Sequence, residues 1–143
     1  MIRFENVTKV YARGARPAVD DVSLEVRRGE FVFLVGASGS GKSTCLHLVL
    51  REERPTKGKV FVAGRDLGSM SSWNVPKLRR QIGVVFQDFR LLPNKTVFEN
   101  VAFALQLIGK PRHTIAITVP ETLEMVGLAG PAKRRPAELS GAA

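Results

Sequence analysis

The chain has a single cysteine and lacks any long apolar run, and these absences exclude several classes of protein. Its one cysteine among 143 residues, Cys45, rules out an internal disulfide framework and favours a reducing compartment. No apolar stretch approaches the roughly 18 residues that a membrane-spanning helix requires. The opening Met1-Ile-Arg-Phe-Glu-Asn6 carries charges where a secretory signal needs an apolar stretch, so we expect a cytoplasmic protein.

Acidic residues are scarce relative to basic ones. The sequence has 13 Asp and Glu against 22 Lys and Arg, a formal net charge of +9. Such a charge favours anionic partners, either nucleic acid or the anionic cytoplasmic face of a membrane. The basic residues form only short clusters without interleaved aromatic residues, so we expect a solvated basic surface and no specific nucleic-acid site. These clusters are Arg27/Arg28, Arg79/Arg80 and Lys133/Arg134/Arg135.

Residues 36–44 read Gly-Ala-Ser-Gly-Ser-Gly-Lys-Ser-Thr, a complete phosphate-binding loop. Glycines let the backbone turn tightly, so that successive N–H groups can point inward at a di- or triphosphate. Lys42 supplies a mobile cation for the β- and γ-phosphates, and the Ser43 hydroxyl can ligate Mg²⁺. The predicted nucleotide-binding residues of this loop are Gly36, Ala37, Ser38, Gly39, Ser40, Gly41, Lys42, Ser43 and Thr44.

The flanking sequence supports this prediction. The apolar run Phe31 to Val35 is typical of a buried strand, and Cys45 to Arg51 is predicted to continue as a helix whose N-terminus favours anions. Cys45 lies near that N-terminus, where the helix dipole would lower its pKa and make it reactive. The alternative, a small packed residue, is favoured because cysteine is commonly buried.

The other predicted elements follow from local patterns. Val22, Leu24 and Val26 alternate with polar residues, which suits a half-buried antiparallel strand. Thr96 and Glu99 have the spacing of a capping box at the start of a helix. A helix over Arg112 to Val126 is expected to break or restart at Pro120. Strands are predicted at Ile2–Val10, Val19–Val26, Lys59–Ala63 and Ile82–Phe86, and a short helix at Pro76–Arg80.

Several separated pieces match one family in their order along the chain. They are Tyr11, the phosphate loop, Gln87 directly after an apolar strand, and Glu138-Leu-Ser-Gly141 near the end. Together these pieces make the chain resemble the ATP-binding subunits of ABC transporters over its whole length. Within that family, the opening Met1 to Tyr11 and the run Phe89 to Leu105 are similar to cell-division ATPases of the FtsE type.

The resemblance implies an α/β fold, a P-loop NTPase of the ABC ATPase type. It implies an N-terminal antiparallel β subdomain and the start of a helical subdomain, with a sheet that is incomplete because the C-terminal half is absent. The whole chain, 1–143, would be the N-terminal portion of an ATP-binding domain. We expect an antiparallel β region at 1–30, a P-loop core at 31–87 and a partial helical subdomain at 88–143.

The resemblance also implies roles for individual residues, with ATP and Mg²⁺ as cofactors. Tyr11 would stack on adenine, since every base offers a π-face; the alternative is a strand-end tyrosine without a ligand. Gln87 would reach both Mg²⁺ and the attacking water, so Lys42 and Gln87 are the expected catalytic residues and Ser43 and Gln87 the expected metal ligands. The segment Phe89 to Thr96 would meet the membrane subunit. Leu91, Leu92 and Phe98 either contribute to that contact or lie in the core.

The sequence departs from the family pattern at its end. Ser140 and Gly141 match only the beginning of the family's signature, which acts on the ATP of the opposite subunit in a head-to-tail homodimer. The later aspartate, glutamate and histidine of the pattern are absent, and neither His47 nor His113 stands at that histidine's place. We therefore expect the parent protein to be an ATP hydrolase and this chain to bind nucleotide with little or no turnover.

The implied function is the ATP-binding component of a complex with an FtsX-like integral membrane subunit. It would couple ATP binding and hydrolysis to cell division and septal cell-wall remodelling, at the cytoplasmic face of the bacterial inner membrane. One alternative is the ATP-binding subunit of a conventional exporter or lipoprotein-release transporter. A GTP-dependent switch is disfavoured because the nearest guanine-reading string, Asn94 to Val97, has valine where a carboxylate is needed. A DNA-associated ATPase is motivated only by the +9 charge.

Overall fold

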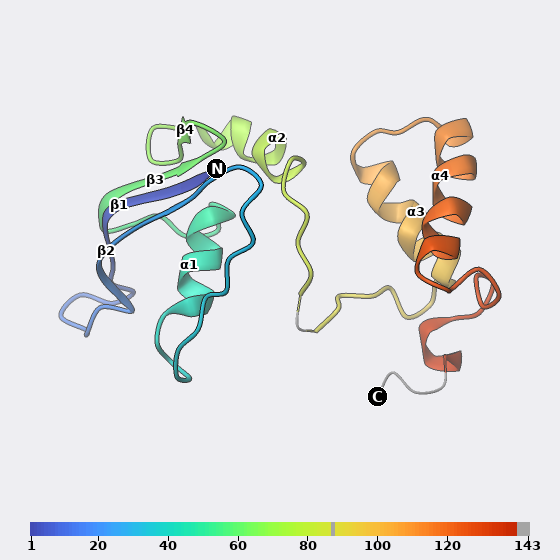
Figure 1. Ribbon diagram of the computed structural model, residues 1–143, viewed down its shortest axis with the longest axis horizontal. Coiled ribbons are helices and arrows are strands. Elements are labelled where there is room, and N and C mark those ends of the chain that lie inside the picture. Colours follow the sequence, from blue (N-terminus) through green and yellow to red (C-terminus); the bar gives the residue numbers. More distant parts are fainter. Residues whose placement is uncertain (87, 140–143) are drawn as a thin grey trace. The chain divides into compact units, whose positions relative to one another are not determined.

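The computed structural model describes residues 1–86 and 88–139 and divides the chain into two compact units (Figure 1). The first unit is Met1–Gly83, and the second begins at Val84. Each unit is described by itself below. The predicted subdivision at residues 30 and 87 stays a prediction.

The first unit is built on a four-stranded antiparallel sheet with the order β2-β1-β3-β4. The predicted strands at the N-terminus are confirmed, because β1 is Ile2–Lys9 and β2 is Val19–Val26. Strand β3, Lys57–Val62, begins earlier than predicted, and the short β4, Arg65–Asp66, was not predicted. Phe4 of central strand β1 pairs with Leu24 of β2 on one side and with Val60 of β3 on the other.

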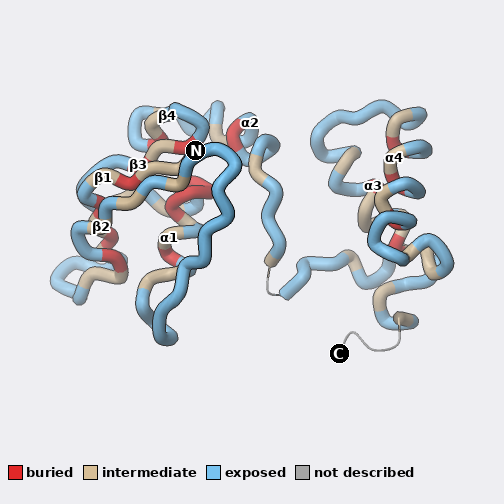
Figure 2. The backbone as a smooth tube through the Cα atoms, viewed as in Figure 1, coloured by how far each residue is buried: buried red, intermediate tan, exposed pale blue. Residues whose placement is uncertain are grey.

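Helix α1, Lys42–Val49, packs on this sheet and supplies the core of the first unit. Leu48 of α1 is 1% exposed and belongs to one cluster with Phe4 and Val7 of β1 and Val60 of β3. Leu78 of the short helix α2, Val75–Arg79, joins the same cluster and is fully buried. The buried parts of the tube in Figure 2 follow these elements. Fixing α1 against the sheet also fixes the loop that precedes it.

Two predicted strands are wrong. Phe31–Val35 forms no strand, and Phe31 and Val35 are 84% and 83% exposed. Ile82–Phe86 likewise forms no strand, and Val85 is 91% exposed. The physical reason is that a strand requires a hydrogen-bonded neighbour, and no described residue of the chain pairs with either segment. An apolar run is therefore a property of the segment, whereas strand formation also depends on its partners.

The second unit contains two helices that pack on each other, α3 (Val97–Leu107) and α4 (Arg112–Met125). The predicted extent of α4 is confirmed to within one residue at its C-terminus, but the predicted break at Pro120 is wrong, because the helix continues through it. Proline removes one backbone N–H donor, which normally bends or ends a helix. Here Val119 and Leu123, on either side of Pro120, are 0% and 1% exposed, so their burial against α3 holds the helix together.

The predicted capping box at the start of α3 is confirmed. The Thr96 hydroxyl accepts a hydrogen bond from Glu99 N at 3.2 Å, and the Glu99 carboxylate accepts one from Thr96 N at 2.7 Å. The backbone hydrogen bond from Thr96 is the main cause that lowers the pKa of Glu99. Asn100 adds to this cap, because its side chain forms hydrogen bonds with both N and O of Leu92.

The described residues also form two short 3₁₀ helices. They are η1 (Ser72–Asn74) in the first unit and η2 (Pro136–Glu138) in the second.

The apolar residues of this second unit divide between core and surface. Phe98 packs against the core cluster, whereas Leu91 is 52% exposed and remains available for a contact. Over residues 1–86 and 88–139, no helix is both long enough and apolar enough to cross a bilayer.

Candidate nucleotide-binding site

Two residues in the loop at residues 36–41 have a backbone conformation that glycine adopts with little strain. Gly39 and Gly41 have φ angles of +78° and +91°, in the left-handed region. Gly41 also lies so close to the start of β2 that a Cβ would be 2.2 Å from the Ala18 carbonyl oxygen. Ser40 N donates to Ala37 O at 3.2 Å and closes a turn within the loop. The glycines are therefore required both for backbone conformation and for close packing.

The N-terminus of α1 begins directly after this loop and is free of side-chain caps. Gly41 is its N-cap residue, and no side chain of the described chain caps the helix; its first turn contains no acidic residue. The first N–H groups of a helix have no intrahelical acceptor and carry partial positive charge. This helix end therefore offers backbone donors and a favourable dipole to an anion.

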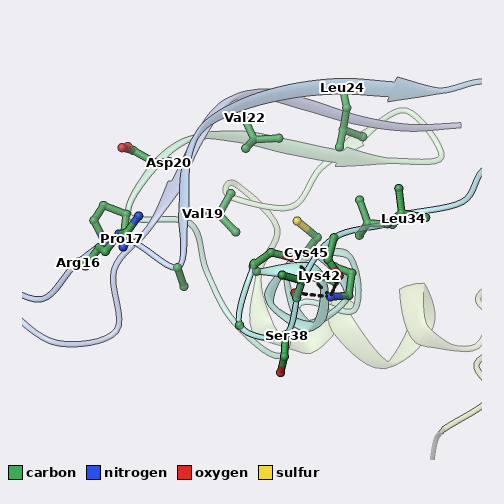
Figure 3. A pocket seen from close by; sticks show the side chains of 17 residues that line it. Arg16, Pro17, Val19, Asp20, Val22, Leu24, Leu34, Ser38, Lys42 and Cys45 are labelled. Carbon is green, nitrogen blue, oxygen red and sulfur yellow. Dashed lines mark hydrogen bonds between the residues drawn. The ribbon is translucent and has the colours of Figure 1, made fainter.

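Lys42 closes the loop from the helix side. Its Nζ donates to the carbonyl oxygens of Gly36 at 2.7 Å and Ala37 at 2.8 Å, and Ser40 Oγ lies 3.4 Å away (Figure 3). Hydrogen bonds from an ammonium group to a charged phosphate oxygen are stronger than those to a neutral carbonyl. A bound phosphate would therefore compete well for the same ammonium group, which already lies over the loop.

Ser43, Thr44 and Tyr11 extend the site along the first turn of α1. Ser43 is exposed, whereas Thr44 is buried. The Tyr11 hydroxyl donates to Thr44 Oγ1 at 3.3 Å, so the structure brings the predicted base-stacking residue to the phosphate loop from 33 residues away in sequence. Tyr11 as a residue is 55% exposed.

An open cavity of about 850 Å³ adjoins the loop (Figure 3). One side is polar and consists of the phosphate loop with Lys42; the other is apolar and includes Val22, Leu24 and Cys45. Only the loop side suits a triphosphate, because burying phosphate charge against apolar side chains is unfavourable. Arg16, at the rim, adds a positive charge that the sequence analysis missed, since residues 12–17 gave only a turn signal.

The single cysteine is a packed residue. Burial raises the pKa of the Cys45 thiol, which is opposite to the reactive-thiol alternative. Cys45 contacts the core cluster of the first unit, as the favoured alternative predicts.

His47 has a protein partner. Its Nδ1 lies 2.5 Å from Glu52 Oε2, so its position requires no ligand.

Three predicted residues lie outside the described part of the chain: Gln87, Ser140 and Gly141. Their roles stay predictions. Elsewhere in the structure, no group of three or more His, Cys, Asp or Glu side chains could hold a metal ion. Of the two predicted magnesium ligands, the structure describes only Ser43, which lies in the first turn of α1.

A sequence profile described as "ABC transporter" matches residues 19–143. The chain belongs to the ABC transporter family. Among curated relatives, the cell division ATP-binding protein FtsE of Mycobacterium tuberculosis is 55% identical over 141 residues, which cover 99% of this chain and 61% of that protein. The methionine import ATP-binding protein MetN of Geobacillus kaustophilus is 46% identical, with 99% of this chain and 42% of that protein covered. The chain thus spans about three-fifths of the length of its FtsE relatives.

A solved structure confirms the fold class of this ABC-family chain. The dimeric ATP-binding cassette MJ0796, in a post-hydrolysis state bound to ADP and Pi, superposes with a TM-score of 0.84 and 35% identity. The match covers 98% of this chain and 63% of that one. The fold is therefore that of a P-loop NTPase of the ABC ATPase type, with its antiparallel β part and helical part both present and the sheet incomplete in the described residues.

We predict that Gly41→Ala disrupts this site. The new Cβ would collide with the Ala18 carbonyl oxygen, and the left-handed φ adds strain, so both the melting temperature and nucleotide affinity should fall, affinity by at least tenfold. Gly39→Ala is the matched control: it has a similar φ but no atom within 4 Å of the added Cβ, so only the strain of about 1–2 kcal/mol is expected. Thermal unfolding and ATP titration of both variants measure the difference, and equal effects would contradict the close-packing argument.

Proposed function

We propose that this chain is the nucleotide-binding part of an ABC-type ATPase. The phosphate loop, residues 36–44, holds the phosphates of ATP, and the ring of Tyr11 stacks on adenine. The observation that carries the proposal is the start of α1, where uncapped backbone donors, the Lys42 ammonium group and the hydroxyl contact of Tyr11 converge. Each group contacts a different part of one nucleotide.

The residues of the chain divide the work of binding. Backbone N–H groups at the N-terminus of α1 bind phosphate oxygens, and Lys42 neutralises charge on the β- and γ-phosphates. Bound Mg²⁺ would neutralise further charge on the same oxygens, with Ser43 and Gln87 as its proposed protein ligands. Gln87 would also orient the attacking water, which makes Lys42 and Gln87 the proposed catalytic residues. Tyr11 supplies a flat face that tolerates any base.

We predict that Lys42→Ala weakens ATP binding by at least tenfold, because the ammonium group that closes the loop is lost. Titration with a fluorescent ATP analogue measures the affinity. Lys77→Ala, which removes an exposed lysine on α2, is the control and should leave binding unchanged. Unaltered affinity of the Lys42 variant would refute the assignment of the phosphate site.

The 143-residue chain by itself is expected to bind ATP with little or no turnover. Its sequence contains no Asp-Glu dipeptide at the end of an apolar strand and no third histidine that could contact the γ-phosphate. A positioned general base contributes roughly 10²- to 10⁴-fold to the rate, and a metal-bound carboxylate would contribute further. A phosphate-release assay on the purified chain tests this expectation. Turnover comparable with that of an intact family member would contradict it.

The cell-division relatives support a finer proposal. FtsE proteins of M. tuberculosis and Bacillus subtilis are 55% and 47% identical to this chain. We propose that the protein resembles them in coupling ATP binding and hydrolysis to cell division and septal remodelling. Its proposed partners are an FtsX-like integral membrane subunit and, in the full-length protein, a second copy bound through the nucleotide sites. It would act as a peripheral protein at the cytoplasmic face of the bacterial inner membrane.

A second candidate is the ATP-binding subunit of a nutrient importer, which the 46% identity to a methionine import protein supports. Nucleotide chemistry cannot separate the two candidates, because they share the phosphate loop.

Identifying the membrane protein that co-purifies with this protein can separate the two candidates. We predict that the full-length protein retains an FtsX-type membrane protein, and that Leu91→Asp, which alters an exposed apolar residue, reduces this retention. Retention of an importer permease instead would favour the second candidate.

A further inference from the structure

The side chain of Tyr11 is contacted at its ring as well as at its hydroxyl. Lys9 Nζ lies over the ring, 4.9 Å from the ring centroid, which is within the range of a cation–π interaction. The hydroxyl bonds Thr44 on the first turn of α1. One contact fixes the tip of the side chain and the other supports a face of the ring. Tyr11 as a whole is still 55% exposed, so surface of the residue remains for a ligand.

Lys9 is itself held in place. It is only 9% exposed, and its Nζ donates to Glu53 Oε2 at 2.6 Å and to the Arg54 carbonyl oxygen at 3.0 Å. A mostly buried ammonium group with such partners does not swing away from its site, because leaving them would strand the carboxylate and the amine. The Lys9 ammonium group over the Tyr11 ring is therefore held in a fixed position by the fold.

Backbone hydrogen bonds also fix the residues that precede Tyr11. Val10 N donates to Thr56 Oγ1 at 3.0 Å, and Thr56 N donates to Thr8 O at 2.8 Å. On the other side, Ala18 N donates to Lys9 O at 2.8 Å. Residues 53–56 follow the C-terminus of α1, while Thr44 lies in its first turn. Both ends of one helix thus set the position of Tyr11 relative to the phosphate loop.

We infer that Lys9, oriented by Glu53, is a positioning residue that holds the Tyr11 ring ready to stack on the purine of ATP. The inference rests on the proposed function, because it requires Tyr11 to contact the base. Lys9 supports one face of the ring, and the base stacks on the exposed surface. Holding the ring in place before binding removes the entropic cost of ordering it in the complex. The phosphates do not depend on this arrangement, since they contact the loop.

The test compares ATP with a ligand that has the phosphates but lacks the nucleoside, which includes the base that Tyr11 would stack on. Isothermal titration of the purified protein measures the affinity for ATP and for inorganic tripolyphosphate, which has phosphates but no base. Lys9→Met keeps the length of the side chain and removes the cation. It should weaken ATP binding roughly three- to tenfold and leave tripolyphosphate binding unchanged. Lys9→Arg should restore ATP binding, and Lys77→Met on α2 is the matched surface control.

The inference also predicts coupling between the two residues. In a Tyr11→Leu background, Lys9→Met should cause no further loss of ATP affinity, because no ring remains to be positioned. Glu53→Gln keeps Lys9 but removes the charge that orients it, so this variant should also weaken ATP binding. It serves as a second variant if Lys9→Met lowers the melting temperature of the protein. An equal loss for both ligands, or an additive loss in the Tyr11→Leu background, would overturn the positioning role.

The two proposals fail in different ways. If Tyr11→Leu weakens ATP binding but Lys9→Met and Glu53→Gln do not, the positioning role is wrong and base stacking stands. If Tyr11→Leu leaves ATP affinity equal to that of the unaltered protein, base stacking by Tyr11 is wrong, and the role of Lys9 falls with it. The phosphate site is tested separately by Lys42→Ala with tripolyphosphate as the ligand.

Discussion

The packing of α1 against the antiparallel sheet is the constraint on which the rest of the first unit depends. Leu48 anchors the helix in a core shared with β1 and β3, and Gly41 lets the helix begin in direct contact with the start of β2. Once the helix is fixed, its first turn holds the phosphate loop, Lys42 and the hydroxyl of Tyr11. Burial of a leucine of this kind contributes about 1.5–3 kcal/mol, so a single core residue of α1 affects the site strongly.

Local patterns in the sequence correctly predicted several elements. The Thr96–Glu99 spacing predicted a capping box because both partners lie within one helical turn, and β2 was predicted because Val22, Leu24 and Val26 alternate with polar residues. The phosphate loop could be recognised from the sequence because its glycines act through the backbone at their own positions. Pro120 was misjudged because the burial of Val119 and Leu123 depends on α3, which no local pattern shows.

Features that need distant partners were not predictable from the sequence in this way. The apolar run Phe31–Val35 satisfies every local criterion for a strand, yet its backbone has no described partner and its side chains are exposed. The pair formed by Lys9 and Glu53 was also missed, because 44 residues separate the two and neither stands in a recognised motif. Only the fold shows that the residues after α1 contact Lys9 and Val10, the two residues that precede Tyr11.

One of the basic residues of the chain, Arg79, has a structural role near α1. The side chain of Arg79, on α2, donates to the carbonyl oxygens of Leu50 and Arg51 at 2.9 and 3.3 Å, directly after the C-terminus of the helix. Cations at that end of a helix are favoured by about 0.3–1 kcal/mol through the helix dipole. The opposite end has Gly41 as its N-cap, uncapped backbone donors and the Lys42 ammonium group, with no acidic residue in the first turn. Arg79 thus compensates the negative end of α1, and the uncapped positive end with Lys42 favours an anion at the phosphate loop. The role of Arg79 at the helix end does not require nucleic acid.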